Sequence, residues 1–378
     1  MADIVEETTN SWGSRLGDSL KGIVIGIVIF LLAFPLLFWN EGNSVKQFKI
    51  LSEGSGLVLS VPAETVNAQN EGKLVHSSGT AQTAQMLEDS IFKVSANAIK
   101  LKRSVEMFQW KEDTKKETTK QVGGSTKDKT TYSYKKVWSD SLINSSSFKD
   151  ATNKNPAVMP YKSDEITAKD VKFGAFTLPP TLVSRINKYQ PLVIAPSQIS
   201  SVPNAKVEAG GFYIGLSSAN PQIGDMKVTF SQVPSQPVSL VSKQVGSSFE
   251  PYQTKAGGTI ELLQLGTVSA ANMFKQAQES NVAMTWVFRV VGFLLMFGGM
   301  SLVLKPLSVL ADVLPFLGNL VEKGTGFIAF IIAVIFASLT VSISWILARP
   351  LLGLGLLAVS VVLIGGVVAM SFKLKKTA

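Results

Sequence analysis

Long apolar runs near the two ends of the chain constrain its fold more than any other feature. The first, residues 22–39 (GIVIGIVIFLLAFPLLFW), has 18 residues without a charge, about the minimum that crosses a membrane as a helix. Further runs follow at 282–304, broken only by Arg289, at 327–347 and at 351–370. We therefore predict an integral membrane protein with four transmembrane α-helices. No small-residue cleavage site follows the first run, so we interpret it as a signal anchor.

The composition excludes several classes of protein. With 46% hydrophobic and 17% charged residues, the chain is too apolar for a disordered protein. It has no Cys and one His, which excludes disulfide scaffolds and thiolate metal sites and argues against a His-rich zinc site. We predict no cofactor and no metal.

Residues 40–281 contain no comparable apolar run and are long enough to bury their own core. We predict a β-rich α+β domain inserted between spans one and two. Its charges are mixed in sign rather than gathered in a basic patch, so we do not expect it to bind nucleic acid.

The clearest strand pattern in this domain covers residues 99–138. Ile99, Leu101, Val105 and Met107 share one face, and a polar stretch with Gly123-Gly124 near its middle follows. We predict one long hairpin with a hydrophilic tip, or alternatively two shorter strands joined by a disordered loop. The opposite phase of Phe108 and Trp110 predicts a β-bulge.

Later strands are predicted at 211–216, 226–233, 238–245 and 259–265, where Pro and Gly punctuate the sequence. Thr267 or Ser269 is predicted to cap a helix that leads into span two.

The lysines that flank the spans predict their orientation. Lys373, Lys375 and Lys376 lie in the tail, residues 371–378, which places the C-terminus in the cytoplasm. With four spans, the N-terminal segment 1–21 is cytoplasmic too, and the large domain faces a lumen, the periplasm or the exterior. Segment 1–21 carries an amphipathic stripe typical of an interfacial helix. Segment 305–326 is apolar but broken, which predicts an interfacial or re-entrant loop.

Several motifs in order along the chain resemble the LUMA (transmembrane protein 43) family. They are SWGSRLGDSLKGIVIG, LLFWNEG, EGKLVH, KLKRSVEMFQW, YSYKKVWSDSLINSSSF, NPQIGDMKVTF, KPLSVLADVLPFLGNLVEKGTG and ARPLLG. The resemblance implies a four-span protein of the endoplasmic reticulum and inner nuclear membrane that self-associates and organises membrane protein complexes, with emerin and lamins as partners. In a bacterial homologue the domain would lie in the periplasm, and lamin-like partners could not be transferred.

Polar residues inside the spans are the candidate site. Arg289 is the only charge within a span, and an ion in lipid is costly. It could reach the interface, form a structural pair, or take part in binding or permeation. Ser338, Thr340, Ser342 and Ser344 form polar rows in span three, which could bond to their own helix or line an interface or pore.

Small residues are the helix-packing candidates. Gly22 and Gly26 form a G-x-x-x-G in span one, and Gly298 and Gly299 lie in span two. Such residues let helices approach closely in lipid, either inside one bundle or between copies.

No residues predict catalysis. The chain has no phosphate-binding loop, no nucleophile elbow and no H-E-x-x-H. His76 is expected to be a surface or core histidine. Glu71, Glu106, Glu112 and Asp225 are expected on solvated strand faces unless the fold pairs them.

We therefore predict a non-catalytic membrane scaffold whose partners are the lipid bilayer, a second copy of itself and other membrane proteins. The alternative is an oligomeric ion channel or transporter that uses the transmembrane bundle. An enzyme is the third and weakest hypothesis.

Overall fold

The computed structural model describes residues 3–196 and 200–348, and beyond them scattered positions between 351 and 365. The chain divides into two compact units. The β-rich unit comprises residues 1–5, 50–115 and 131–275, and the helical unit comprises 6–49, 116–130 and 276–378.

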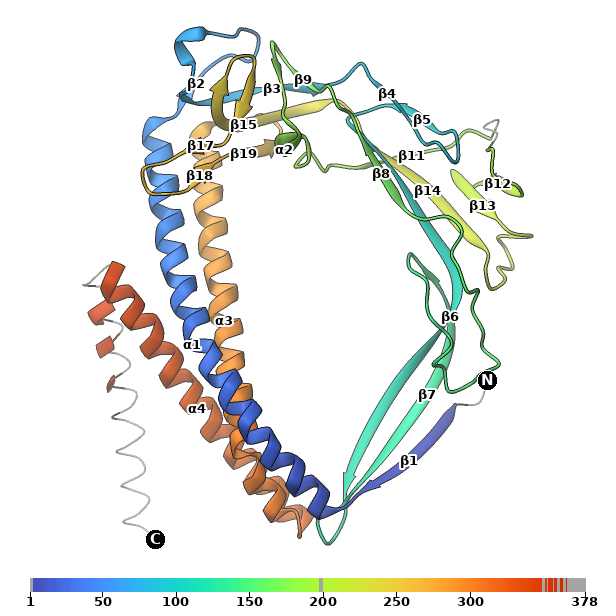
Figure 1. Cartoon of the computed structure of the whole chain (residues 1–378), viewed down its shortest axis with the longest axis vertical. Helices are drawn as coiled ribbons and strands as arrows, with labels where there is room; N and C mark the ends of the chain where they lie inside the picture. The colour runs from blue at the N-terminus through green and yellow to red at the C-terminus, as the bar shows by residue number, and fades with distance from the viewer. Residues whose placement is uncertain are drawn as a thin grey trace. The chain divides into compact units, whose positions relative to one another are not determined.

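The β-rich unit is built from many short strands and a few long ones (Figure 1). In chain order they are β2 (Leu59–Ser60), β3 (Leu74–Gln82), β4 (Met86–Glu88), β5 (Ser95–Asn97), β6 (Lys100–Lys120), β7 (Thr126–Ser139), β8 (Asp164–Thr167), β9 (Lys172–Phe173), β10 (Phe176–Thr177), β11 (Gln190–Leu192), β12 (Ala205–Glu208), β13 (Gly211–Ile214), β14 (Met226–Val233), β15 (Gln236–Val245), β16 (Ser248–Glu250), β17 (Tyr252–Gln253), β18 (Thr259–Ile260) and β19 (Leu262–Leu265). A 3-10 turn, Ala68–Asn70, and a short helix α2, Pro180–Val183, interrupt them.

Two large sheets contain most of these strands, and β4 with β5 and β17 with β18 form two-stranded sheets of their own. The first has the order β1-β7-β6-β14-β13-β12, where β1 is Ile4–Asn10, with β8 paired to β6 and β11 to β14. The second has the order β10-β9-β3-β15-β16, with β2 and β19 paired to β3 and β15. Strand β2 runs parallel to β3, whereas β14 with β6 and β15 with β3 are antiparallel, as are most of the other pairs. The predicted strands at 211–216, 226–233, 238–245 and 259–265 are thus confirmed, the last as two successive short strands, β18 and β19, which pair with β17 and β15.

One apolar core holds the β-rich unit together. It gathers Phe92, Phe173, Phe176, Phe212 and Phe249 with aliphatic residues from both sheets, all almost completely buried. Burying large aromatic side chains removes much apolar area from water and is the main source of stability here.

The predicted hairpin is present as β6 and β7, and Gly123 and Gly124 adopt positive φ in its turn. The predicted bulge is wrong. Leu101, Val105, Met107 and Gln109 are all buried, so the same alternate positions of the strand face the core along this stretch. Phe108 and Trp110 lie on the other face of the strand, where Phe108 packs against Trp138 with ring centroids 5.0 Å apart.

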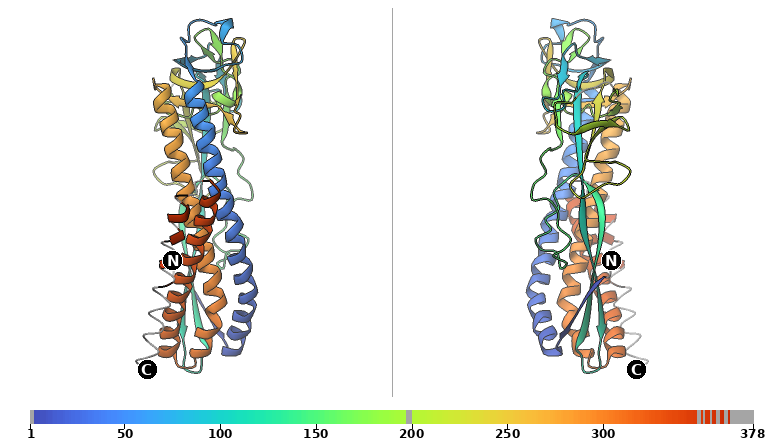
Figure 2. Two further views of the ribbon diagram at one scale, coloured as in Figure 1. Left: turned by 90° about the vertical axis from the view of Figure 1, so that its left-hand side faces the viewer. Right: turned by 90° about the vertical axis from the view of Figure 1, so that its right-hand side faces the viewer.

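Three long helices make up most of the helical unit, and the ribbon views place them side by side (Figures 1 and 2). They are α1 (Trp12–Leu57), α3 (Ala270–Ala311) and α4 (Pro315–Ala348). Each is long and apolar enough to cross a membrane. The predicted spans at 22–39, 282–304 and 327–347 fall within them, and the run at 351–370 lies mostly outside the described residues. The Ser269 hydroxyl accepts the Asn272 amide at 3.4 Å, as predicted for the cap of α3.

The helices are longer than the predicted spans, because the polar residues that flank each apolar run are helical as well. Helix α1 is continuous from Trp12, so no separate interfacial helix precedes it, and residues Ile4–Asn10 form strand β1. The segment predicted as a broken loop, 305–326, is helical except for the short link between Ala311 and Pro315. Pro35 lies inside α1 and Pro306 inside α3. Transmembrane helices tolerate proline because groups on neighbouring helices can bond to the backbone carbonyls that proline leaves free.

A small core joins the helices. Ala33, Leu37, Met296 and Ala333 are fully buried within it. Edge-to-face rings surround them, including Phe30 with Phe336 at 5.5 Å and Phe293 with Phe330 at the same distance.

Candidate functional site

Arg289, the one charge predicted inside a span, forms an ion pair with Glu41. Its Nε donates to Glu41 Oε1 at 2.6 Å and its Nη2 donates to Oε2 at 2.8 Å. The Glu41 side chain is 1% exposed and that of Arg289 is 18% exposed. The two bonds connect Arg289 on α3 to Glu41 on α1 and satisfy the buried carboxylate. This two-pronged geometry is common between Arg and carboxylates.

Two tryptophans complete this cluster, which we call the Arg289 network (Glu41, Trp286, Arg289 and Trp345). The indole of Trp345 on α4 donates to Glu41 Oε2 at 2.6 Å. The guanidinium carbon of Arg289 lies 4.7 Å from the Trp286 ring centroid and 5.7 Å from that of Trp345. Cation–π contacts strengthen when the cation is desolvated. The network thus links α1, α3 and α4 through one carboxylate.

A short polar ladder continues from the network between α1 and α3. The Asn40 amide donates to the Thr285 carbonyl at 3.1 Å, and the Asn281 amide donates to the Ser44 carbonyl at 3.0 Å. The hydroxyls of Ser44 and Thr285 lie 2.8 Å apart. These bonds fix the register of the two helices, because each side chain reaches one particular partner on the facing helix.

The hydroxyl rows of α4 bond to their own helix. Thr340, Ser342 and Ser344 each donate to the carbonyl four residues earlier, at 2.7, 2.7 and 2.9 Å. Thr340, Ser342 and Ser344 are also buried, and Ser338 is half-buried. This geometry matches the simpler of the two interpretations of the rows.

The candidate glycines divide into two pairs. A Cβ built on Gly26 would lie 2.5 Å from the Gly299 carbonyl oxygen, and one built on Gly299 would lie 2.7 Å from that of Gly26. Helices α1 and α3 therefore cross at these two glycines, where any side chain would force them apart. A Cβ on Gly22 or Gly298 would meet nothing within 4 Å.

A second polar cluster lies at the end of the helical unit where α1 begins. We call it the bundle-end cluster: Trp12, Arg15, Lys120, Gly124, Asp312 and Glu322. Arg15 pairs with Asp312 and donates to the Gly124 carbonyl. Lys120 lies 2.9 Å from Asp312 and 2.7 Å from Glu322. The Asp312 side chain is 1% exposed, so two cations compensate one buried carboxylate.

The tip of the β6–β7 hairpin is held in this cluster by its glycines. A Cβ on Gly124 would collide with the Trp12 ring, and the Gly123 amide donates to the Val313 carbonyl at 3.0 Å. The Trp12 indole donates to the Val309 carbonyl at 2.9 Å. Burial acts against the charge of Lys120, but the carboxylates of Glu322 and Asp312 raise the pKa of Lys120 above its ordinary value.

This contact bears on the predicted orientation. Arg15 is expected in the cytoplasm and the hairpin on the opposite side of the membrane, yet the two touch. While the contact is formed, Arg15 and Gly124 lie on one side. The orientation stays a prediction, with this added requirement.

The remaining predicted residues of the β-rich unit do not converge. His76 is buried, with Nε2 2.9 Å from the Val268 carbonyl and Nδ1 3.2 Å from the Ser60 hydroxyl, as expected for a core histidine. Glu71 accepts the Gly246 amide, Glu112 accepts the Lys149 amide, and Asp225 accepts the Tyr213 hydroxyl at 2.6 Å. Among the described residues, no group of three or more His, Asp or Glu could hold a metal ion.

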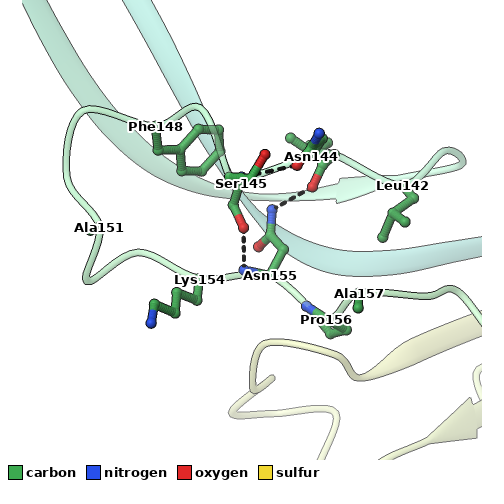
Figure 3. A pocket seen from close by; sticks show the side chains of 11 residues that line it. Leu142, Asn144, Ser145, Phe148, Ala151, Lys154, Asn155, Pro156 and Ala157 are labelled. Atoms are coloured by element: carbon green, nitrogen blue, oxygen red, sulfur yellow. Dashed lines mark hydrogen bonds between the residues drawn. The ribbon is translucent and has the colours of Figure 1, made fainter.

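A cavity of about 590 Å³ lies beside the loop after β7 (Figure 3). Asn155 holds this loop by donating to the carbonyls of Trp110 and Ile143 and by accepting the Trp110 amide. The Ser145 hydroxyl accepts the Asn155 amide at 2.9 Å. These side chains bond to the backbone rather than converging on the cavity, so the loop is a structural element.

The sequence is similar to proteins of one known family. The family model described as Transmembrane protein 43 matches residues 107–350. The rat (Rattus norvegicus) protein of that name is 35% identical over 351 residues, which cover 89% of this chain and 87% of the relative. The chain belongs to the transmembrane protein 43 family.

More distant relatives give the same assignment. The human (Homo sapiens) transmembrane protein 43 is 34% identical over 89% of this chain and 87% of its own length. The fruit fly (Drosophila melanogaster) homologue is 29% identical over 94% of both. No solved structure matches the chain. The chain is therefore an integral membrane protein of the transmembrane protein 43 family, as the motifs predicted.

Sequence reasoning found Arg289 but missed its partner. Glu41 lies two residues beyond the first apolar run, in the motif LLFWNEG that supported the resemblance to the family. An ion inside a span needs a counter-ion, and a carboxylate at the end of a neighbouring span was the available signal. Asp312 and Arg15 likewise lie in family motifs, but nothing in the sequence indicates that the hairpin tip meets them.

Proposed function

We propose that this member of the transmembrane protein 43 family is a non-catalytic membrane scaffold that self-associates and organises other membrane proteins. The observation that carries the proposal is the open surface of its helices. The most apolar stretches of α1, α3 and α4 are only 17%, 17% and 22% buried within the chain, as far as it is described. Lipid, a second copy or another membrane protein must cover the remainder.

The internal bonding of the helices supports a scaffold rather than a moving gate. The Arg289 network joins three helices through one carboxylate, and Gly26 and Gly299 bring α1 and α3 into backbone contact. Breaking such a buried pair is costly, which favours a single arrangement of the helices.

The residues that suggested a channel or transporter bond to other groups of the chain. Arg289 is paired with Glu41, and the α4 hydroxyls bond to their own backbone. We therefore prefer the scaffold. Equal ion leak from liposomes with wild type, with Arg289→Ala and without protein would agree with this choice, whereas leak specific to the wild type would favour conduction.

The resemblance to the family extends the proposal to a compartment. In an animal cell we place the protein in the endoplasmic reticulum and inner nuclear membrane, with emerin- and lamin-like partners. In a bacterial cell the same scaffold would lie in the inner membrane with the β-rich unit in the periplasm.

The test is the number of copies in each purified particle. Full-length protein is extracted with its surrounding lipid and its mass is measured by light scattering over a range of dilutions with excess lipid. We expect two or more copies that persist on dilution. A strict monomer with no co-purifying membrane protein would overturn the proposal.

A further inference from the structure

A cavity of about 440 Å³ lies in the helical unit beside the bundle-end cluster, within the usual size range of small-molecule sites. Helices α1, α3 and α4, strand β1 and the tip strands of the hairpin contribute its walls. The lining residues are Asn10, Arg15, Asp18, Ser19, Gly22, Thr118, Lys120, Thr126, Asp128, Leu302, Lys305, Val309 and Glu322.

The cavity lies where two helices change from polar to apolar. On α1, Asp18 precedes the apolar run that begins at Gly22. On α3, the apolar run ends at Leu304 and Lys305 follows it. Gly22 and Leu302 therefore mark the hydrocarbon side of the cavity, and Asp18 and Lys305 mark the side of the headgroups.

The charges of the lining cancel. Three cationic residues, Arg15, Lys120 and Lys305, face three acidic ones, Asp18, Asp128 and Glu322. An anionic lipid needs an excess of Lys and Arg, as polybasic sites show. The balance therefore favours a ligand that carries both charges.

Two of these charged residues are available to a ligand. Arg15, Lys120 and Asp128 already have close partners in Asp312, Glu322 and Lys116. Lys305 has no ion pair within the described part of the chain. The bond of Asp18 to Lys21, at 3.2 Å, joins two mostly exposed side chains and contributes little.

We propose that this cavity binds the headgroup of a phosphatidylethanolamine-type lipid. The Lys305 ammonium contacts the lipid phosphate, and the Asp18 carboxylate accepts hydrogen bonds from the lipid ammonium. The acyl chains leave past Gly22 and Leu302. A choline headgroup has no N–H to donate and is recognised by aromatic side chains, and the lining contains none.

The experiment measures lipid retention by the purified full-length protein. Delipidated protein in detergent micelles is titrated with phosphatidylethanolamine, phosphatidylcholine or phosphatidylglycerol of matched acyl chains, and native mass spectrometry counts the bound lipids. We expect phosphatidylethanolamine to bind most tightly. Lys305→Gln and Asp18→Asn should each weaken it about tenfold, which corresponds to about 1.4 kcal/mol of binding free energy.

Lys323→Gln is the matched control, because it removes a lysine outside the lining and should leave retention unchanged. An acyl-free arm with glycerophosphoethanolamine separates a lipid site from a site for a soluble phosphate: competition at equal concentration would overturn the lipid assignment. Equal retention of the three lipids, preference for phosphatidylglycerol, or wild-type retention in both cavity variants would overturn the proposal.

Discussion

At the scale of single residues, Glu41 decides how a charge is accommodated among apolar helices. It accepts two bonds from Arg289 and one from Trp345, so neither ion remains unpaired. Such a pair contributes little net stability when complete, but each partner depends on the other.

Glu41→Gln tests this dependence. The substitution leaves the Arg289 cation buried without a counter-ion, and we expect a loss of about 3–5 kcal/mol in the free energy of unfolding. The double variant Glu41→Leu/Arg289→Leu should recover most of the loss because no charge is left. Denaturant unfolding in nanodiscs measures both. Lys46→Gln, an exposed change on the same helix, is the control, and a Glu41→Gln protein as stable as this control would contradict the argument.

Tyr213 in the β-rich unit predicts a pH dependence. Burial, with the nearby Asp225 carboxylate, raises the pKa of the Tyr213 hydroxyl above its ordinary value of 10.0. The folded state therefore holds this proton more tightly than the unfolded state, so the stabilisation is complete below pH 10.0 and is lost as pH rises through the folded-state pKa. When ionisation of the tyrosines is followed by absorbance at 295 nm, the Tyr213→Phe protein should lack one of the tyrosines that ionise at the highest pH in the wild type. Loss of a tyrosinate at ordinary pH would contradict the prediction.

At the scale of elements, the hairpin shows how a polar ribbon finds a specific contact. Its turn has two glycines at positive φ, and only the second packs against Trp12. Positive φ alone would allow the turn in solvent, but the close approach of the ring requires Gly124 in particular.

Gly123→Val and Gly124→Val form a matched pair. Both place a branched residue at positive φ and carry a similar backbone cost, but only Gly124→Val collides with the Trp12 ring. We expect trypsin to cut the lysines of the tip several-fold faster in Gly124→Val than in Gly123→Val, because an undocked tip is open to the protease. Equal cleavage of the two variants would show that the tip is not held by Trp12.

At the scale of the whole molecule, the contact between Arg15 and Gly124 constrains how the chain can be oriented in the membrane. A polar ribbon cannot lie in lipid, because its unpaired edge groups and charges would go unsatisfied. The contact of Arg15 with Gly124 therefore requires the start of α1 and the hairpin tip to reach the same aqueous side.

Single cysteines test this requirement, since the chain has none of its own. Gly13→Cys and Val122→Cys place a thiol at exposed positions near the start of α1 and at the tip. We expect an impermeant maleimide to label both from the same side of sealed vesicles. Val158→Cys, also exposed, reports the side of the β-rich unit separately. Labelling of Gly13→Cys and Val122→Cys from opposite sides would contradict the contact.

The sequence by itself determined which segments are apolar helices, where the hairpin turns, and to which family the chain belongs. These features depend on composition and period over neighbouring residues, as at 22–39 and at Gly123-Gly124, and local chemistry sets them. It also identified Arg289 as the residue needing an explanation.

Only the tertiary structure decided the partners. Glu41 and Arg289 are separated by 248 positions, and Arg15 and Asp312 by 297. Periodicity places each on a helix but does not say which faces meet, because that depends on how apolar surfaces from distant segments pack. The same limit explains the wrong prediction of a bulge in β6. The buried face of this strand includes Arg103 and Gln109. Polar residues are buried only where the fold supplies hydrogen-bond partners, so their burial cannot be predicted from the pattern of apolar residues.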